Sequence, residues 1–249
     1  MSQAFRDHFS KQSDEYARHR PTYPATIFAW LAGQSAGRTL AWDCATGNGQ
    51  AALGLATYFD TVVATDASAE QIDRAFAHER VVYRVAPAED AGLATASADL
   101  VTVAQAVHWF DHERFWPEVK RVLRPGGLVA VWAYHHCRIR PEIDPILRAY
   151  YEDVVGPYWP AEVQRIEQGY EALDFPFDER DRPDFEAEAA WTLESCLGYL
   201  GSWSATQRYR DDRGDDPREQ IRPALEAVWG PPELTRRVAW PLVMRVGRA

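Results

Sequence analysis

The sequence predicts an α/β protein built on a doubly wound, mostly parallel sheet, and two observations in its first half carry that prediction. Short apolar runs typical of buried strands recur at residues 39–42, 61–65, 81–85, 100–104 and 128–132. Amphipathic stretches of helical length lie between them, at residues 50–58, 69–78 and 112–123. Because alternating strands and helices make consecutive strands parallel, we expect helices on both faces of the sheet.

The segment Arg124-Pro125-Gly126-Gly127 is expected to end a helix and turn the chain into the fifth strand, since proline stops a helix and glycine tolerates a positive φ. After Tyr134 the pattern changes. Helices are predicted at residues 140–155, 161–172, 193–203 and 217–228, an edge strand at 184–191 and a last strand at 238–246. With these two strands the predicted sheet has seven strands. The predicted helices form a cap that is inserted before the last strand.

The acidic stretch around Gly214 is expected to be a solvated loop without chemistry. Its members are Asp211, Asp212, Asp215 and Asp216.

Composition and charge exclude several classes of protein. Hydrophobic residues make up 46% and charged residues 26% of the 249 residues, which is typical of a folded domain with a real core. The net charge is −10, from 27 basic and 37 acidic residues, so we expect neither nucleic acid nor an anionic membrane as a partner. No apolar run reaches the roughly 18 residues of a membrane span, and the first twenty residues are too charged for a signal peptide. A cytoplasmic location is therefore expected.

The cysteine and histidine positions do not predict a metal site. Cys44, Cys137 and Cys196 are far apart in the sequence, so they form neither a disulfide framework nor a metal-binding pair, and reduced thiols are expected. His135 and His136 precede Cys137, but adjacent residues of a strand point to opposite faces.

The turn after the first strand contains the main ligand signal. The segment Trp42-Asp43-Cys44-Ala45-Thr46-Gly47-Asn48-Gly49-Gln50 is a strand-to-helix turn whose two glycines let the backbone approach a ligand closely. The second strand ends at Asp66, 19 residues after Gly47, where a carboxylate can accept hydrogen bonds from both ribose hydroxyls of an adenosine. This placement favours NAD or another adenosine ligand over NADP.

Two acidic features distinguish between the adenosine ligands. Asp43 lies four residues before Gly47, where it would repel a pyrophosphate but attract an ammonium and a sulfonium group. The turn Ala88-Glu89-Asp90 after the third strand offers a backbone amide and a carboxylate to an adenine ring. Both features favour S-adenosylmethionine.

In these motifs the chain resembles the class I S-adenosylmethionine-dependent methyltransferases. The matching motifs are residues 43–49, Asp66, 88–90, 98–103 and 122–127. The resemblance implies a Rossmann-like fold with a final antiparallel strand and donor contacts from Asp43, Ala45, Gly47, Gly49, Asp66, Ala67, Ala88, Glu89 and Gln105. Ala45 departs from the family pattern, which usually has its first glycine there.

A closer likeness is to the type 11 group, and in particular to the trans-aconitate methyltransferases. Residues 9–10, 16–24, 105–111, 199–204 and 246–248 carry it. The resemblance implies one methyltransferase domain over residues 1–249: lid helices at 1–37, the donor-binding core at 38–134, an acceptor-side helical region at 138–235 and the last strand at 236–249. It also implies a small-molecule acceptor, with a carboxylic acid as one candidate.

The lid resemblance assigns roles to two residues near the N-terminus. Tyr16 and Arg20 share a face if their segment is helical; Arg20 would pair with the methionine carboxylate of the donor and Tyr16 would lie against its sulfonium. The alternative is a helix that only packs on the core.

On the acceptor side, His108 follows the fourth strand at the edge where open α/β sheets bind ligands, so it is the candidate catalytic base. A structural histidine is the alternative. Trp109, Phe110, Tyr199 and Trp203 are candidates for lining an acceptor pocket, against ordinary core packing.

The sequence therefore predicts methyl transfer from S-adenosylmethionine to a small molecule. Two other functions stay open at this point: an NAD-dependent oxidoreductase and a non-catalytic protein that binds S-adenosylmethionine for regulation. The oligomeric state is not predicted.

Overall fold

A computed structural model describes residues 21–134, 136–160, 163, 170 and 173–249 of the chain. Its centre is a mixed sheet in which the strands follow the order β3-β2-β1-β4-β5-β8-β6, and β7 pairs with β8 as well. The strands are β1 (Leu40–Cys44), β2 (Thr61–Asp66), β3 (Val81–Val85), β4 (Ala98–Ala104), β5 (Leu123–Tyr134), β6 (Asp178–Glu179), β7 (Glu186–Trp191) and β8 (Arg236–Arg248). The predicted α/β class and doubly wound sheet are confirmed.

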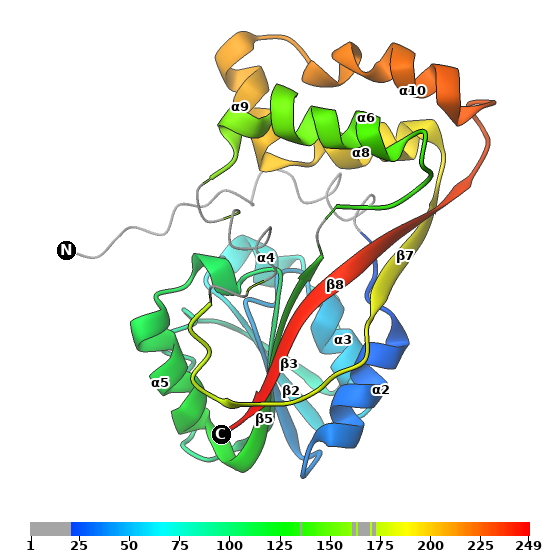
Figure 1. Cartoon of the computed structure of the whole chain (residues 1–249). Coiled ribbons are helices and arrows are strands. Elements are labelled where there is room, and N and C mark those ends of the chain that lie inside the picture. Colours follow the sequence, from blue (N-terminus) through cyan, green and yellow to red (C-terminus); the bar gives the residue numbers. More distant parts are fainter. Residues whose placement is uncertain (1–20, 135, 161–162, 164–169, 171–172) are drawn as a thin grey trace.

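The first five strands are parallel and β8 is antiparallel to β5, as expected. Helices cover both faces of the sheet: α2 (Ala25–Gln34) and α3 (Gln50–Ala56) on one, and α5 (His112–Val122) on the other (Figure 1). The apolar side chains of β1 to β5 alternate between these two faces, so the sheet separates two hydrophobic clusters. Helix α4 (Ala69–Asp73) follows β2 and is shorter than predicted.

The second half of the chain forms a cap beyond the carboxyl ends of the parallel strands (Figure 1). It consists of α6 (Asp144–Ala149), the short helical turns η3 (Tyr150–Val154) and η4 (Gly156–Tyr158), α8 (Leu193–Gly201), α9 (Ser204–Arg213), η6 (Pro217–Gln220) and α10 (Arg222–Trp229). Strand β8 then returns from the cap along the sheet to its opposite end.

The helix predicted at residues 193–203 is confirmed as α8, whereas the loop expected at Asp211 and Asp212 is wrong. The helix predicted at residues 193–203 ends at Gly201, and a separate helix, α9, begins at Ser204 and includes Asp211 and Asp212, which were expected in a loop. Only Ala205 and Thr206 of α9 are buried, so the helix has no apolar stripe for a sequence pattern to reveal. The predicted helix at residues 161–172 lies almost wholly outside the described residues.

The described residues contain no helix that is both long and apolar enough to cross a membrane.

Candidate donor and acceptor site

The turn between β1 and α3 is built from left-handed backbone. Ala45, Gly47 and Gly49 have φ angles of 53°, 57° and 92°, and α3 begins directly afterwards at Gln50. A left-handed conformation costs a non-glycine residue roughly 1–2 kcal/mol, so Ala45 is strained where the resemblance expects a glycine. The sharp turn leaves the first backbone amides of α3 at the carboxyl edge of the sheet.

The two glycines of this turn have different surroundings. A Cβ atom on Gly49 would lie 2.1 Å from the hydroxyl oxygen of Tyr83, which donates a hydrogen bond to the carbonyl of Phe76 (2.9 Å). A Cβ atom on Gly47 would meet nothing closer than a side-chain oxygen of Gln71 at 3.9 Å. Gly49 therefore accommodates the chain's own tyrosine, whereas the backbone of Gly47 can be approached closely by a ligand.

Asp43 is 1% exposed, and each of its carboxylate oxygens accepts a hydrogen bond from a threonine hydroxyl. Thr46 donates to one oxygen (2.5 Å) and Thr102 to the other (2.8 Å). Desolvation by burial raises the pKa of Asp43 from 3.8 to about 6, although both hydroxyls oppose that shift. Asp43 therefore adds negative charge beneath the turn at neutral pH.

Asp66, at the end of β2, accepts hydrogen bonds from two backbone amides. The N–H of Gly47 lies 2.9 Å from one carboxylate oxygen and the N–H of Ser68 lies 2.9 Å from the other. Asp66 thus ties the glycine turn to the neighbouring strand. The N-cap of α4 is Ser68, whose hydroxyl accepts from the N–H of Gln71, and Ala67 beside it is exposed.

The turn after β3 is connected to the start of α5. One oxygen of Glu89 accepts a hydrogen bond from the N–H of Asp111 (3.1 Å), and Ala88 is half-buried beside it. This contact holds the turn at the same edge of the sheet, next to the end of β2.

The end of β4 brings Gln105 and His108 to this edge. Gln105 has a φ of 61°, and its side-chain nitrogen Nε2 is buried with no hydrogen-bond partner among the residues that the structure describes. His108 is 3% exposed in the turn η2 (Val107–Trp109), and its Nδ1 lies 3.2 Å from the hydroxyl of Tyr170. Burial raises the pKa of Tyr170 far above its ordinary value.

Comparisons with known proteins identify the family of the chain. Residues 42–131 match a family model described as a methyltransferase domain. A methyltransferase of Dictyostelium discoideum is 32% identical over 225 residues, covering 89% of this chain and 86% of that protein. The chain is a class I S-adenosylmethionine-dependent methyltransferase.

Two further relatives are similar to this methyltransferase. An uncharacterised methyltransferase of Mycobacterium bovis is 42% identical over 127 residues, or 50% of this chain and 51% of that protein. A solved structure named as a type II methyltransferase from Anaeromyxobacter dehalogenans is 47% identical, with a TM-score of 0.87, and covers 92% of this chain and 97% of that one. Family and fold together imply S-adenosylmethionine rather than NAD, the other adenosine ligand that the sequence left open.

The residues of the methyltransferase fit such a donor chemically. The donor is a cationic adenosine derivative, and the edge offers two carboxylates, Asp43 and Asp66, beside the open backbone of Gly47. Nε2 of Gln105, which has no partner among the residues that the structure describes, is a further hydrogen-bond donor at this edge. Tyr16 and Arg20, the predicted lid residues, lie outside the described part of the chain.

Tyr199 and Trp203 lie in an aromatic cluster of the cap. The indole N–H of Trp240 donates to the hydroxyl of Tyr199 (3.3 Å), and the ring of Trp203 lies 5.5 Å from those of Tyr199 and Trp159. Both predicted residues are buried, at 4% and 9% exposure. Their role as an acceptor wall stays a prediction, as does that of half-buried Trp109, whose ring lies 4.9 Å from His108.

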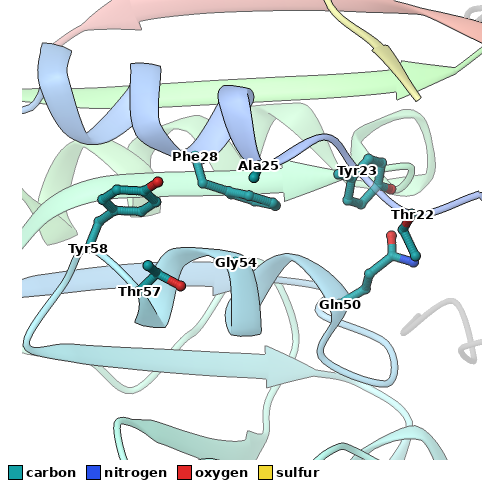
Figure 2. A pocket seen from close by; sticks show the side chains of 8 residues that line it. All are labelled: Thr22, Tyr23, Ala25, Phe28, Gln50, Gly54, Thr57 and Tyr58. Carbon is teal, nitrogen blue, oxygen red and sulfur yellow. The ribbon is translucent and has the colours of Figure 1, made fainter. Parts of the chain in front are cut away.

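A groove of about 280 Å³ lies between α2 and α3 of the methyltransferase (Figure 2). Phe28 lies along it, Tyr58 closes one end, and Tyr23, Thr22 and Gln50 line the other. It includes none of the predicted site residues. Among the described residues, no group of three or more His, Cys, Asp or Glu side chains is placed to hold a metal ion.

Sequence reasoning missed four side chains that shape the site. Thr46 and Thr102 bind Asp43, Tyr83 covers Gly49, and Tyr170 contacts His108. Thr46 was detectable in principle, because it follows Asp43 by three residues. The other three come close only through strand pairing or the packing of the cap.

Proposed function

We propose that the methyltransferase binds S-adenosylmethionine across the carboxyl ends of β1, β2 and β4 and transfers its methyl group to a small carboxylic acid. The observation that supports the donor site best is Asp66, which reaches from the end of β2 to the amide of Gly47. A ribose placed there has a carboxylate for its hydroxyls and an accessible glycine backbone beside it. We propose that the other donor contacts implied by the family resemblance surround this point.

In this proposal each acidic residue has a separate role. Asp66 accepts from the ribose hydroxyls, while Ala67, Ala88 and Glu89 surround the adenine. Asp43 is 1% exposed, whereas Asp66 is half-buried, so Asp43 attracts the ammonium and sulfonium through its charge rather than by direct contact.

In this proposal the methionine part of the donor lies along the turn formed by Ala45, Gly47 and Gly49. Tyr16 and Arg20 close over the methionine part.

The donor supplies an activated methyl group on a positively charged sulfur. The new bond to the acceptor oxygen forms as the carbon–sulfur bond breaks; the sulfur keeps the electron pair and becomes neutral. Because charge disperses in this displacement, the protein has to align the nucleophile and exclude water rather than stabilise a new charge. The buried rings of Tyr199 and Trp203, together with Trp109, are the proposed walls on the acceptor side.

The surroundings of His108 favour an acceptor that arrives already ionised. Its ring is buried and one nitrogen lies within hydrogen-bond distance of the hydroxyl of Tyr170, which is protonated at physiological pH; burial raises the pKa of Tyr170 further above its ordinary value. A carboxylic acid needs no base, whereas a hydroxyl or amine acceptor does. We therefore propose that His108 lines the site without removing a proton.

Replacing Asp66 by alanine is expected to weaken the binding of S-adenosylhomocysteine about 10- to 100-fold, because hydrogen bonds to a charged group contribute roughly 1.5–3 kcal/mol. Calorimetric titration measures this, with Asp73→Ala, an exposed carboxylate on α4, as the control. The melting temperature should also fall, since Gly47 and Ser68 lose their partner. Unchanged affinity in a folded Asp66→Ala protein would remove Asp66 from the site.

Two experiments test the function as a whole. A thermal-shift panel should show stabilisation by S-adenosylhomocysteine and none by NAD or NADP. Transfer of a labelled methyl group should then be measured to matched sets of small carboxylic acids, alcohols and amines. Labelling of alcohols or amines but not of acids would contradict the proposed acceptor class.

Once a carboxylic acid acceptor is found, His108→Gln should change turnover less than about 10-fold, well below the usual contribution of a general base. Glutamine keeps a polar group for Tyr170 but does not titrate. The rate of both proteins should be measured between pH 5.5 and 8.5. A wild-type rate that climbs through a pKa near 6.5, with a loss of roughly 100-fold in the variant, would instead identify His108 as the base.

A further inference from the structure

The loop between β3 and β4, at residues 86–97, is attached to helix α5 near both ends of that helix. Just before the first turn of α5, the N–H of Asp111 donates a hydrogen bond to Glu89 (3.1 Å). In the last turn, the carbonyl of Arg121 accepts a hydrogen bond from the N–H of Ala96 (2.8 Å). Helix α5 therefore helps to determine where the loop lies relative to the carboxyl edge of the sheet.

Glu118 of α5 holds the middle of this loop. It is 8% exposed, and its Oε1 accepts a hydrogen bond from the N–H of Ala91 (3.0 Å), which directly follows the turn Ala88-Glu89-Asp90. Arg121 donates to both carboxylate oxygens of Glu118, at 2.7 and 2.8 Å. These hydrogen bonds lower the pKa of Glu118 below its ordinary value. The carboxylate is therefore ionised, and its bond to Ala91 is charge-assisted.

The ion pair of Glu118 and Arg121 also reaches a second point of the loop. Nη1 of Arg121 donates to the hydroxyl of Thr95 (3.2 Å). An ion pair on an open surface contributes little to stability, whereas breaking a buried pair is costly because a charge is left uncompensated. Because Glu118 is buried, its contacts constrain the loop more strongly than those of a surface pair would.

We propose that Glu118 is a positioning residue for adenine recognition, which acts on the donor through the N–H of Ala91 and the turn Ala88-Glu89-Asp90. This rests on the proposed function, which places the adenine of S-adenosylmethionine against Ala88 and Glu89. Adenine presents an amino donor next to a ring-nitrogen acceptor. A carboxylate and a backbone amide complement these two groups only if the turn is held at hydrogen-bond distance. Glu118 therefore affects the choice of base rather than the binding of the methionine part.

Two ligands that differ only in the base test this proposal: S-adenosylhomocysteine and S-inosylhomocysteine, in which an oxygen replaces the amino group. Calorimetric titration of the wild type should give an affinity about 10-fold or more higher for the first, because the second presents an acceptor where adenine presents a donor. Glu118→Ala should bind S-adenosylhomocysteine about 3- to 10-fold more weakly and should lower the ratio of the two affinities. A purely structural role would lower the melting temperature and leave this ratio unchanged.

Glu118→Gln tests whether the bond to Ala91 is responsible, because glutamine keeps an oxygen for that N–H. This variant should retain most of the wild-type ratio. A ratio as low as that of Glu118→Ala would assign the effect to another contact and overturn the proposal. Should Glu118→Ala not fold, Arg121→Met takes its place: it leaves Glu118 without its ionic partner and Thr95 without its donor, so the ratio should fall as well.

Asp99→Ala is the matched control. Asp99 is also a buried carboxylate that accepts from a backbone amide, that of Thr39 (2.8 Å), and pairs with an arginine, Arg124 (2.7 Å). It lies at the start of β4, at the edge of the sheet opposite the donor site, so its loss should lower the melting temperature without changing the ratio. A wild-type ratio in a folded Glu118→Ala protein, or in Arg121→Met where alanine prevents folding, would overturn the proposal. So would equal affinities of the wild type for both ligands, whereas failure to bind S-adenosylhomocysteine at all would overturn the proposed function.

Discussion

Replacing Gly49 by alanine is expected to lower the free energy of unfolding by about 3 kcal/mol or more, the sum of two separate penalties. The first is a left-handed backbone, with φ at 92°. The second is overlap, because the new methyl group would lie 2.1 Å from the hydroxyl oxygen of Tyr83. Urea unfolding followed by circular dichroism measures the change.

Gly92→Ala is the control that separates the two penalties. Gly92 also has a positive φ, 63°, but a Cβ atom there would meet nothing within 4 Å. It should therefore cost only about 1–2 kcal/mol. Equal losses in the two variants would show that Tyr83 moves aside freely and does not constrain the turn.

Replacing Asp43 by asparagine is expected to stabilise the ligand-free methyltransferase by up to about 3 kcal/mol at pH 7.5, since a shift of one pKa unit corresponds to 1.36 kcal/mol. Burial raises the pKa of Asp43 from 3.8 to about 6, so its charged form is disfavoured in the folded state. Asparagine carries no charge and can still bond with the hydroxyls of Thr46 and Thr102.

The pH dependence of this effect has a definite sign. The protonated carboxyl favours the folded state fully below the unfolded pKa of 3.8, and this contribution is lost as the pH rises to the folded pKa of about 6. The wild type and Asp43→Asn should therefore have similar stability near pH 4 and diverge up to about pH 6. Thermal melts at a series of pH values measure it; parallel curves would contradict the assigned pKa.

The same substitution is expected to weaken donor binding about 10-fold or more, because a unit charge near a cation contributes a few kcal/mol at an effective dielectric constant of about 20. Affinity of the wild type for S-adenosylmethionine should rise with pH through about 6, as Asp43 ionises. In Asp43→Asn this rise should be absent. A variant that binds as tightly as the wild type would show that the charge of Asp43 serves only the fold.

The strands of the donor-binding core could be located because each contains a short apolar run, although β3, at the edge of the sheet, is largely exposed. The predicted runs at 61–65 and 81–85, for example, correspond to β2 at Thr61–Asp66 and β3 at Val81–Val85. Helix α9 was missed for the opposite reason: its contacts with the cap involve Ala205 and Thr206 rather than an apolar stripe. Tertiary packing, not local pattern, determines such a helix.

The candidate site likewise combines residues that the local sequence reveals with residues that only tertiary packing brings together. Asp43 and Asp66 were identifiable because a strand end and a glycine turn give them fixed places in the sequence. Thr102 could not be identified, since it reaches Asp43 only through the pairing of β1 with β4 across 59 residues. The same holds for Tyr170, which contacts His108 across 62 residues.

Strand β8 restricts how far the cap can move relative to the sheet. Its first half, up to Pro241, pairs with β7 beside the cap, and its second half, from Leu242, pairs with β5 in the sheet. One continuous strand of 13 residues thus connects the cap to the sheet without a hinge loop. A rotation of the cap relative to the sheet would require β8 to bend or to shift its register against β5 or β7. A chimera that exchanges α8 to α10 for the helices of a relative should therefore retain both β7 and β8 and have both junctions between these two strands.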